Sequence, residues 1–412
     1  MQFSWDFLNT LAQQHGDAFY LVDSTQFLAN YQEFLQAFRC VYPNTQIAYS
    51  YKTNYLPKFC ELVQAQGGYA EVVSGMEYCL ALRIGVPAAR IIFNGPYKRR
   101  DDFQMAALNG SIINLDAAYE IPWLQAIAEK YPEQTLRIGL RCNFSLAAET
   151  QRSRFGFDVE TDDFLKALRA LQRLPNCQIV GLHCHYLAAE RSPQAYQAIA
   201  KRLLALATEH FGNQPLEFID LGGGFFSHMR PELKQQFNFR IPSFTEYGQA
   251  IGEVFANAFP QSTGPELILE PGLALTADAM QFIAEVIHIK QLGARQLALI
   301  AGSIYDIKPT LSQRQLPMAV VPSNAKTQES RVYDLVGYTC MENDCLYRGF
   351  TGVLAPGDFV VFENVGAYTN VLRPPFINPA PPILSFSASG NVEVLRRRET
   401  AADVFETYTF AD

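Results

Sequence analysis

The sequence predicts an α/β fold in which a (β/α)8 barrel of the TIM type is joined to a C-terminal β domain. From about residue 30 to residue 280, short apolar runs alternate with helix-like segments, as in repeated β-α units with a parallel sheet. About eight such runs over about 250 residues are what an eight-stranded barrel requires. Beyond residue 280 the runs become strand-like. We therefore expect a barrel over 28–278 and a β-sandwich-like or β-barrel-like domain built from 1–27 and 279–412.

The expected elements follow from hydrophobic periodicity. Seven barrel strands stand out as apolar runs, at 46–50, 90–94, 110–114, 136–140, 178–182, 218–221 and 266–270. Apolar residues spaced by three and four predict helices between them, at 54–66, 74–85, 101–109, 117–131, 161–173, 193–211 and 244–258. In the second domain we expect strands at 282–286, 296–300, 332–336 and 359–362.

Composition narrows the class of protein. With 49% apolar and 18% charged residues the chain is globular, and its net charge of −8 argues against a nucleic-acid partner. The eight cysteines form no CxxC pair and lie in apolar contexts, which is typical of reduced thiols and predicts a cytoplasmic protein. No signal-peptide pattern and no apolar stretch of about 18 residues is seen, so we expect no membrane association.

Chemistry-bearing residues follow the predicted strands, and the C-terminal ends of barrel strands face the active site. In chain order they are Lys52, Asn94-Gly95-Pro96, Arg141, His183, His185, Gly222-Gly223-Gly224 and Glu270-Pro271-Gly272. Taken alone, Lys52 could be a surface lysine, the glycine run a tight turn, and Glu270 part of a structural ion pair. Together they supply an amine for an imine, a ring for stacking, a carboxylate for a pyridinium proton and backbone donors for a phosphate. Pyridoxal 5′-phosphate (PLP) is therefore the expected cofactor.

A metal is the alternative for the histidine pair. His183 and His185 alternate along one strand and could both be ligands, but no third histidine or acidic ligand lies near them in the pattern. We therefore predict no metal. A metal-dependent barrel hydrolase using these two histidines and Glu270 is kept as a remote alternative.

Several ordered motifs carry a family resemblance over nearly the whole chain. Tyr49-Ser50-Tyr51-Lys52-Thr53-Asn54 resembles the PLP-lysine segment of the fold-type III decarboxylases, the alanine-racemase-like group with ornithine, arginine and diaminopimelate decarboxylases. Further similar segments are Glu71-Val72-Val73-Ser74-Gly75-Met76-Glu77, Arg154-Phe155-Gly156, Gly181-Leu182-His183-Cys184-His185, Asp220-Leu221-Gly222-Gly223-Gly224, Glu270-Pro271-Gly272, Gly337-Tyr338-Thr339-Cys340 with Asp344, and Gly366-Ala367-Tyr368.

The resemblance implies an amino-acid decarboxylase that works through an external aldimine and a quinonoid. Lys52 would bind PLP, Glu270 would keep the ring nitrogen protonated, and His185 would stack on the ring. Gly222, Gly223, Gly224 and Tyr368 would hold the phosphate, with Glu71, Arg141 and Gly272 completing the cofactor site. Cys340 would protonate the product carbon from the partner subunit of a homodimer with shared active sites.

The substrate position departs from the family pattern. Relatives that recognise a distal amine carry an acidic residue after the cysteine, where this chain has Met341. An apolar side chain cannot pair with an ammonium, so we expect a modified or acylated amino acid, as in siderophore or other secondary-metabolite pathways. Glu342 or Asp344 could substitute, and Lys308 with Arg373 could meet a substrate carboxylate. The phosphate contacts also differ, with Leu273 in place of an arginine and Tyr186-Leu187-Ala188 in place of a serine-bearing segment.

Three other functions remain open at this stage. An amino-acid racemase would share Lys52 and the barrel, although Glu270 disfavours it because a carboxylate there favours a protonated ring nitrogen. A diaminopimelate, ornithine or lysine decarboxylase with unusual specificity residues is the second. A non-catalytic PLP carrier is the third, and the second domain argues against it.

Overall fold

The computed structural model describes residues 3–146, 152–185, 190–212, 214–323, 329–386 and 391–411. The chain divides into two compact units. We call residues 28–226 and 241–275 the barrel unit, and residues 1–27, 227–240 and 276–412 the β unit. Residues 227–240 fall within the range expected for the barrel, but their contacts group them with the β unit.

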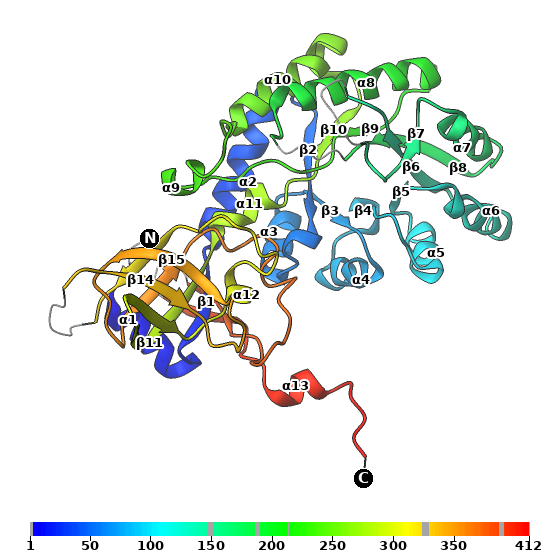
Figure 1. The fold of residues 1–412 in the computed structure, drawn as a ribbon. Helices are drawn as coiled ribbons and strands as arrows, with labels where there is room; N and C mark the ends of the chain where they lie inside the picture. Colours follow the sequence, from blue (N-terminus) through cyan, green and yellow to red (C-terminus); the bar gives the residue numbers. More distant parts are fainter. Residues whose placement is uncertain are drawn as a thin grey trace. The chain divides into compact units, whose positions relative to one another are not determined.

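The barrel unit is a closed ring of eight parallel strands, which confirms the predicted fold class (Figure 1). The strands are β2 (Thr45–Ser50), β3 (Tyr69–Val72), β4 (Ile91–Phe93), β5 (Ile112–Leu115), β6 (Leu136–Asn143), β8 (Cys177–His183), β9 (Phe218–Asp220) and β10 (Glu266–Leu269). Strand β10 pairs with β2 and closes the ring. The short strand β7 (Phe157–Asp158) adds to β6. The strand missing from the sequence-based list is β3, whose four residues include the charged Glu71.

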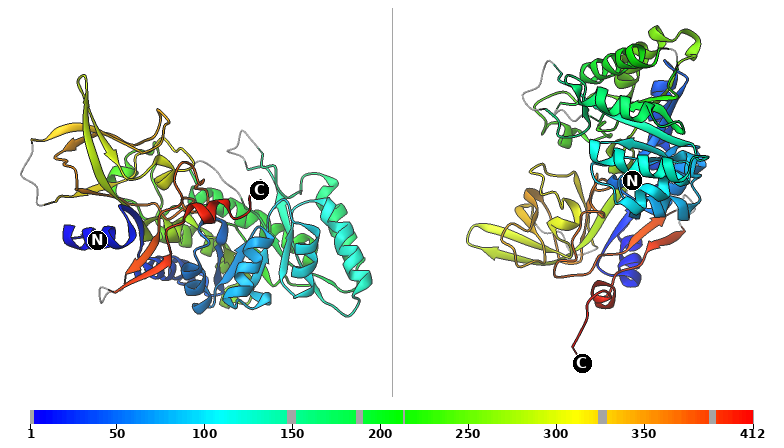
Figure 2. Two further views of the ribbon diagram at one scale, coloured as in Figure 1. Left: turned by 90° about the horizontal axis from the view of Figure 1, so that it is seen from below. Right: turned by 90° about the vertical axis from the view of Figure 1, so that its right-hand side faces the viewer.

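Helices surround these strands (Figures 1 and 2). They are α2 (Ser24–Arg39), α3 (Pro57–Ala65), α4 (Gly75–Ile84), α5 (Arg100–Leu108), α6 (Ile121–Lys130), α7 (Asp162–Gln172), α8 (Pro193–Phe211), α10 (Phe244–Ala258) and α11 (Leu273–Thr276). Several begin at a side-chain cap, such as Ser243, whose hydroxyl accepts from the Glu246 N–H in a capping box. Among the described residues no helix combines the length and apolar character needed to span a membrane.

An aromatic side chain fills the barrel interior. Phe218 of β9 is buried with Ala48, Ile92, Ile112, Val180 and Ile268 from neighbouring strands. Its ring lies against the backbone of β8, where a Cβ on Gly181 would come within 2.3 Å of the ring atoms. Glycine at this position is therefore required for the ring to fit, and the filled interior leaves the strand ends as the place for a site.

The β unit is a mixed sheet that the N-terminal segment completes. Its strands are β1 (Ala18–Val22), β11 (Met280–Leu292), β12 (Arg295–Ile300), β13 (Met318–Val321), β14 (Arg331–Val336), β15 (Cys345–Gly352), β16 (Phe359–Phe362), β17 (Ile383–Phe386) and β18 (Val392–Arg396). Strand β1 pairs with β11 on one side and β17 on the other. Helix α1 (Trp5–His15) covers it through Leu8 and Leu11. The short helices are α9 (Pro231–Lys234), α12 (Ile304–Ile307) and α13 (Ala401–Phe405).

Candidate active site

The amine of Lys52 lies at a strand end beside a buried acid. Strand β2 ends at Ser50, and the single turn that follows, Tyr51–Thr53, carries the lysine. The Lys52 Nζ donates to Ser50 Oγ at 2.7 Å and pairs with the carboxylate of Glu71 on β3. The Lys52 side chain is 31% exposed whereas that of Glu71 is 1% exposed. A small molecule can therefore reach the amine while the acid beneath it stays out of water.

Two asparagines connect the buried carboxylates. Asn94, directly after β4, donates through Nδ2 to Glu71 Oε1 at 3.0 Å and to Glu270 Oε1 at 2.5 Å. Asn114 of β5 donates to Asn94 Oδ1 at 2.8 Å and so fixes which way the amide points. Residues in or directly after four strands, β3, β4, β5 and β10, thus belong to one hydrogen-bonded cluster.

Glu270 is held as an anion. It follows β10 and is buried, with its oxygens 3.4 Å from His183 Nε2 and 3.7 Å from His185 Nδ1. Burial by itself raises the pKa of this carboxyl, but His183 and, to a smaller extent, Lys52 outweigh burial and hold the pKa well below its usual range. A buried carboxylate of this kind can stabilise a proton on a base placed opposite to it.

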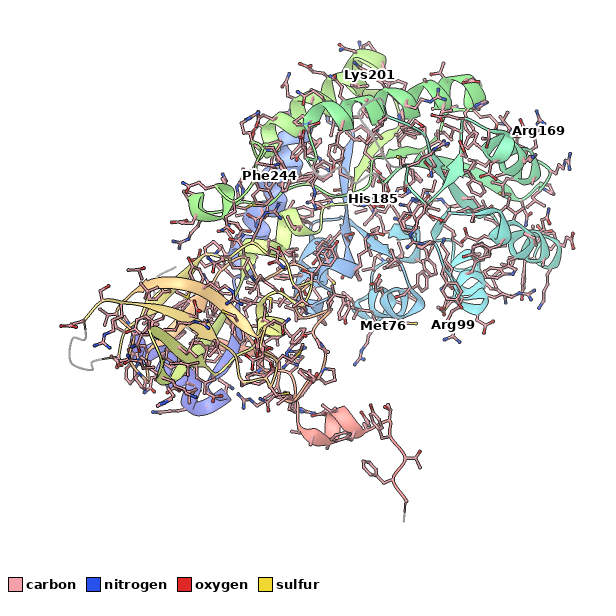
Figure 3. All side chains as sticks on the ribbon, in the orientation of Figure 1. Met76, Arg99, Arg169, His185, Lys201 and Phe244 are labelled. Carbon is pink, nitrogen blue, oxygen red and sulfur yellow. The ribbon has the colours of Figure 1, made fainter. Side chains whose placement is uncertain are left out.

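His185 presents a neutral ring. Burial lowers the pKa of this histidine despite the nearby Glu270 carboxylate. Its Nδ1 accepts a hydrogen bond from the Gly223 N–H at 2.9 Å, so that nitrogen carries no proton. The ring lies among the barrel strands, whereas Arg169 on α7 and Lys201 on α8 point to the outside of the barrel unit (Figure 3). A flat, uncharged ring anchored to the backbone suits stacking.

The glycine run after β9 forms a close-fitting cradle. A Cβ on Gly222 would lie 2.7 Å from His185 Nδ1, and one on Gly223 would lie 2.3 Å from the Glu270 carbonyl oxygen. Gly222 and Gly224 have φ angles of +67° and +94°, which other residues rarely adopt. The Gly222 N–H donates to Asp220 Oδ1 at 2.8 Å. Because the Gly222 and Gly223 N–H groups have these partners, and none is seen for the Gly224 N–H within the described part of the chain, the Gly224 end of the run could bind an anion.

Arg141 and Gly272 frame the cluster. Arg141, on β6, pairs with Asp116 at 2.8 Å and reaches the His185 carbonyl at 3.5 Å. A Cβ on Gly272 would lie 2.0 Å from Thr53 Oγ1, so this glycine lets the turn after β10 pack against the turn that carries Lys52. Arg141 thus contacts the backbone of His185, and Gly272 lies against the turn that carries Lys52.

Comparison with known proteins identifies the family. Residues 28–277 match the family described as "Pyridoxal-dependent decarboxylase, pyridoxal binding domain". The chain belongs to this family. It is therefore a PLP-dependent amino-acid decarboxylase, and the racemase, carrier and metal-hydrolase alternatives are set aside.

Relatives match this decarboxylase over nearly its full length. The diaminopimelate decarboxylase of Aquifex aeolicus is 25% identical over 405 residues, covering 95% of this chain and 91% of the relative. The L-glutamyl-[BtrI acyl-carrier protein] decarboxylase of Niallia circulans is 27% identical over 424 residues, covering 97% and 94%. In fold, a diaminopimelate decarboxylase from M. jannaschii has a TM-score of 0.87 at 24% identity, covering 98% of this chain and 94% of that one.

The strand-end residues of this decarboxylase fit PLP. The site combines an accessible amine, a buried anion, a neutral ring and a loop where no side chain fits. Three buried polar atoms beneath these groups, Asp220 Oδ2 and both ring nitrogens of His183, make no hydrogen bond within the described part of the chain. PLP, when bound, supplies an electron sink for the carbanion left by CO2 loss.

The β unit of the decarboxylase carries the cysteine motif. Cys340, Met341 and Glu342 are exposed. Asp344 is buried, and its carboxylate accepts hydrogen bonds from the backbone N–H groups of Ile304 at 2.7 Å and Thr339 at 3.0 Å. These bonds occupy the Asp344 carboxylate within the β unit, so the geometry does not support its expected contact with a substrate amine.

The two basic residues expected near a substrate carboxylate are also engaged. Arg373 pairs with Asp306 and donates to the Tyr338 hydroxyl at 3.2 Å, with its side chain 4% exposed. Lys308 is buried and donates to the Arg314 carbonyl at 3.0 Å. Burial lowers the pKa of Lys308. The geometry does not support the expected contact of either residue with a substrate carboxylate, because both side chains donate hydrogen bonds to groups within the β unit.

Three further positions of the family pattern were expected near the phosphate. Tyr368 has a φ of +60° and is 36% exposed, a strained backbone of the kind found at functional sites. Leu273 opens α11 directly after Gly272. Tyr186, Leu187 and Ala188 lie outside the described residues.

The sequence analysis assigned no PLP contact to four residues of the cluster. Ser50, Asn94, His183 and Asp220 all touch the groups that were singled out. Asn94, His183 and Asp220 sit at strand ends, and that position was the available signal. Their hydrogen-bond partners come from other strands, which a local pattern does not reveal.

Proposed function

We propose that this decarboxylase acts on a modified or acylated amino acid rather than on free diaminopimelate, ornithine or lysine. The observation that carries the proposal is Met341, directly after Cys340. A thioether cannot pair with a distal ammonium, and an ammonium left without a partner in a closed site is costly. The site is thus better matched to a side chain whose end is uncharged.

The surroundings of Met341 support this substrate class. The Tyr305 hydroxyl lies 3.3 Å from the Met341 sulfur, and the Tyr305 ring packs edge-on against Phe376 at 6.1 Å. Met341 and Phe376 are 38% and 37% exposed. Thioether and aromatic groups suit an acyl chain or a thioester linker. Because the Asp344 carboxylate already accepts backbone hydrogen bonds, Glu342 is the nearby acid that could still pair with a substrate ammonium and so contradict this proposal.

Sequence similarity supports the proposal only in part. The relatives include one named for a glutamyl group on an acyl-carrier protein and several named for diaminopimelate, at similar identities of 24% to 27%. Because identity does not separate these substrates, the side chain at residue 341 is the more informative feature. A biosynthetic pathway for a siderophore or another secondary metabolite would use such a substrate.

We also propose the roles of the individual residues. The Lys52 amine binds the cofactor aldehyde, Glu270 holds a proton on the ring nitrogen, and His185 stacks on the ring. Cys340, from the partner subunit of a homodimer, delivers the proton to the product carbon. The phosphate and the edges of the site are assigned to Glu71, Arg141, Gly222, Gly223, Gly224, Gly272 and Tyr368.

A substrate panel tests the proposal. CO2 release is measured with the holoenzyme for free diaminopimelate, ornithine and lysine and for ω-acylated and glutamyl-pantetheine analogues. We expect kcat/KM to be at least about 100-fold higher for the best acylated substrate, as an unpaired buried ammonium would cause. Rapid turnover of free ornithine or lysine contradicts the proposal.

Two variants test whether residue 341 sets the substrate preference. Met341→Glu supplies the missing negative charge and is expected to raise turnover of free diamino acids while lowering that of the acylated substrate. Met341→Leu keeps the site apolar and serves as the matched control, with the substrate preference unchanged. If both variants leave the preference as it is, residue 341 does not set specificity.

A further inference from the structure

A buried histidine lies behind Glu270 with no assigned role. His183 is the last residue of β8 and is 1% exposed. Its Nε2 lies 3.4 Å from Glu270 Oε1, and neither ring nitrogen makes a hydrogen bond within the described part of the chain. Buried polar groups are nearly always hydrogen-bonded, so an unpartnered ring aimed at a carboxylate indicates an interaction that tightens in the working enzyme.

A buried acid accompanies this histidine. Asp220 is paired with His183 in the register of β8 and β9 and is fully buried. Its Oδ1 accepts from the Gly222 N–H, whereas Oδ2 has no partner among the described residues. Burial, and next the charge of Glu270, raise the pKa of Asp220 well above its usual range. A raised pKa favours the neutral form of Asp220, whose proton could then be donated in a hydrogen bond.

We propose that His183 is a positioning residue that donates a hydrogen bond to Glu270 from behind and so keeps the shared proton on the ring nitrogen of the cofactor. Neutral Asp220 completes the same support and joins it to the glycine cradle. This inference rests on one part of the proposed function, namely that Glu270 faces the ring nitrogen of PLP.

The physical reason is competition between two bases for one proton. A proton between a carboxylate and a pyridine nitrogen stays on the nitrogen only while the carboxylate is the weaker base, and each hydrogen bond donated to the carboxylate weakens it. Asn94 supplies one such bond at 2.5 Å, and His183 is placed to supply a second. Lys52, His185 and Asp220 are further charged or titratable groups that lie near Glu270.

The test uses the holoenzyme loaded with PLP labelled with 15N at the ring nitrogen. The 15N chemical shift reports whether that nitrogen is protonated, and titration of the apoenzyme followed by absorbance gives the affinity for PLP. His183→Phe removes the donor and keeps a ring, and His183→Leu is a second apolar variant in case the first does not fold. His183→Gln retains a donor. His210→Gln, on α8 beside Phe164, is the matched control outside the site.

We expect His183→Phe to move the 15N signal toward the unprotonated position and to weaken PLP binding by about ten- to a hundredfold, as loss of a hydrogen bond to a charged group would. His183→Gln should restore most of the signal, and His210→Gln should match wild type. Asp220→Asn, which keeps a neutral hydrogen-bonding side chain, should shift the 15N signal and weaken PLP binding less than His183→Phe does.

Each failure has its own signature. If Glu270→Gln shifts the 15N signal but neither His183→Phe nor His183→Leu does, the role of His183 is refuted and the proposed function stands. If Glu270→Gln itself leaves the nitrogen protonated, the placement of Glu270 is wrong and the proposed residue roles fall with it. An Asp220→Asn variant that behaves like His183→Phe overturns the neutral-acid assignment.

Discussion

The side-chain nitrogen of Asn94 lies 2.5 Å from an oxygen of Glu270 and also donates to Glu71, so one amide separates two buried carboxylates. Glu71 belongs to the lysine side of the site and Glu270 to its floor. An amide can donate to both without adding charge, whereas a direct contact between two carboxylates would force one of them to take up a proton. The asparagine therefore keeps two negative charges usable within one small volume.

Replacing Asn94 by leucine should weaken PLP binding by about 1.5–3 kcal/mol, since hydrogen bonds to two charged groups are lost while a side chain branched at the same carbon is kept. Titration of the apoenzyme with PLP gives the dissociation constant. Asn109→Leu is the matched control, because Asn109 donates to the Tyr78 hydroxyl away from the cluster. Equal affinities for both variants would show that the bridge has no bearing on the cofactor.

Replacing Lys52 by alanine should abolish turnover and the visible absorption band of the purified protein, because the amine that binds the cofactor covalently is gone. Absorbance spectroscopy and mass spectrometry after borohydride reduction check this. Lys201→Ala, on the outer face of α8, should retain both the band and the activity. Reduced cofactor on a peptide without Lys52 would contradict the assignment.

A mixture of two inactive subunits tests the shared site. If Cys340 serves the partner's site, a mixed dimer of Lys52→Ala and Cys340→Ala subunits holds one intact site and one doubly defective site. Random mixing should then restore about a quarter of wild-type activity, by the two-fold symmetry of a homodimer. No recovery after mixing would place Cys340 and Lys52 of the same subunit in one site.

Glu77 should make stability depend on pH. Burial, followed by the charge of Glu71, raises the pKa of this carboxyl to about 7. The folded state therefore holds a proton that the unfolded state has already lost, and stability falls as the pH rises from the unfolded pKa near 4.5 to about 7. Glu77→Gln should be more stable than wild type by about 1–3 kcal/mol at pH 8, with little difference at pH 4.5.

Unfolding by urea at several pH values measures this effect. The glutamine can still accept the Val73 N–H, which donates to Glu77 Oε2 at 2.8 Å, so the helix start is preserved. An advantage of Glu77→Gln that is the same at pH 4.5 and pH 8 would show that ionisation is not its cause.

The Lys98–Glu120 ion pair should contribute to the stability of the barrel unit. Both side chains are 0% exposed, and the Lys98 Nζ also donates to the carbonyls of Gly95 and Asn114 at 2.9 and 3.0 Å. Lys98→Met leaves a buried carboxylate unpaired and should cost about 3–5 kcal/mol of unfolding free energy. Adding Glu120→Gln should recover part of the loss. Arg99 is the next residue and is exposed, so Arg99→Met should have little effect. A loss of unfolding free energy as large as that of Lys98→Met would show that the ion pair is not the cause.

Local patterns were enough for most elements and for placing the candidate site residues at strand ends. Helix α10 covers the range expected from its spacing of apolar residues, and β16 was expected at its observed bounds. Lys52, His185 and Glu270 could be expected to lie together because parallel strands of a barrel end on one face, so a strand end in the sequence is already a position in space. Strand β3 was missed because four residues that include a glutamate do not form an apolar run.

Partners could not be predicted in the same way. Asp344 and Arg373 have the charges expected of substrate contacts, yet the first binds backbone N–H groups and the second pairs with Asp306. Asn94 and His183 could be placed at strand ends from the sequence, but no local pattern shows that both reach Glu270, 176 residues from Asn94. A charge in a sequence does not show which group will neutralise it.

The sequence by itself determined the barrel, the family to which the chain belongs and the residues at the strand ends, because periodicity and strand order are encoded by near neighbours. Only the tertiary structure decided which carboxylates are anionic, which glycines admit no side chain and which polar groups are left without a partner. Burial and hydrogen bonding set those properties, and both depend on residues brought together from distant strands.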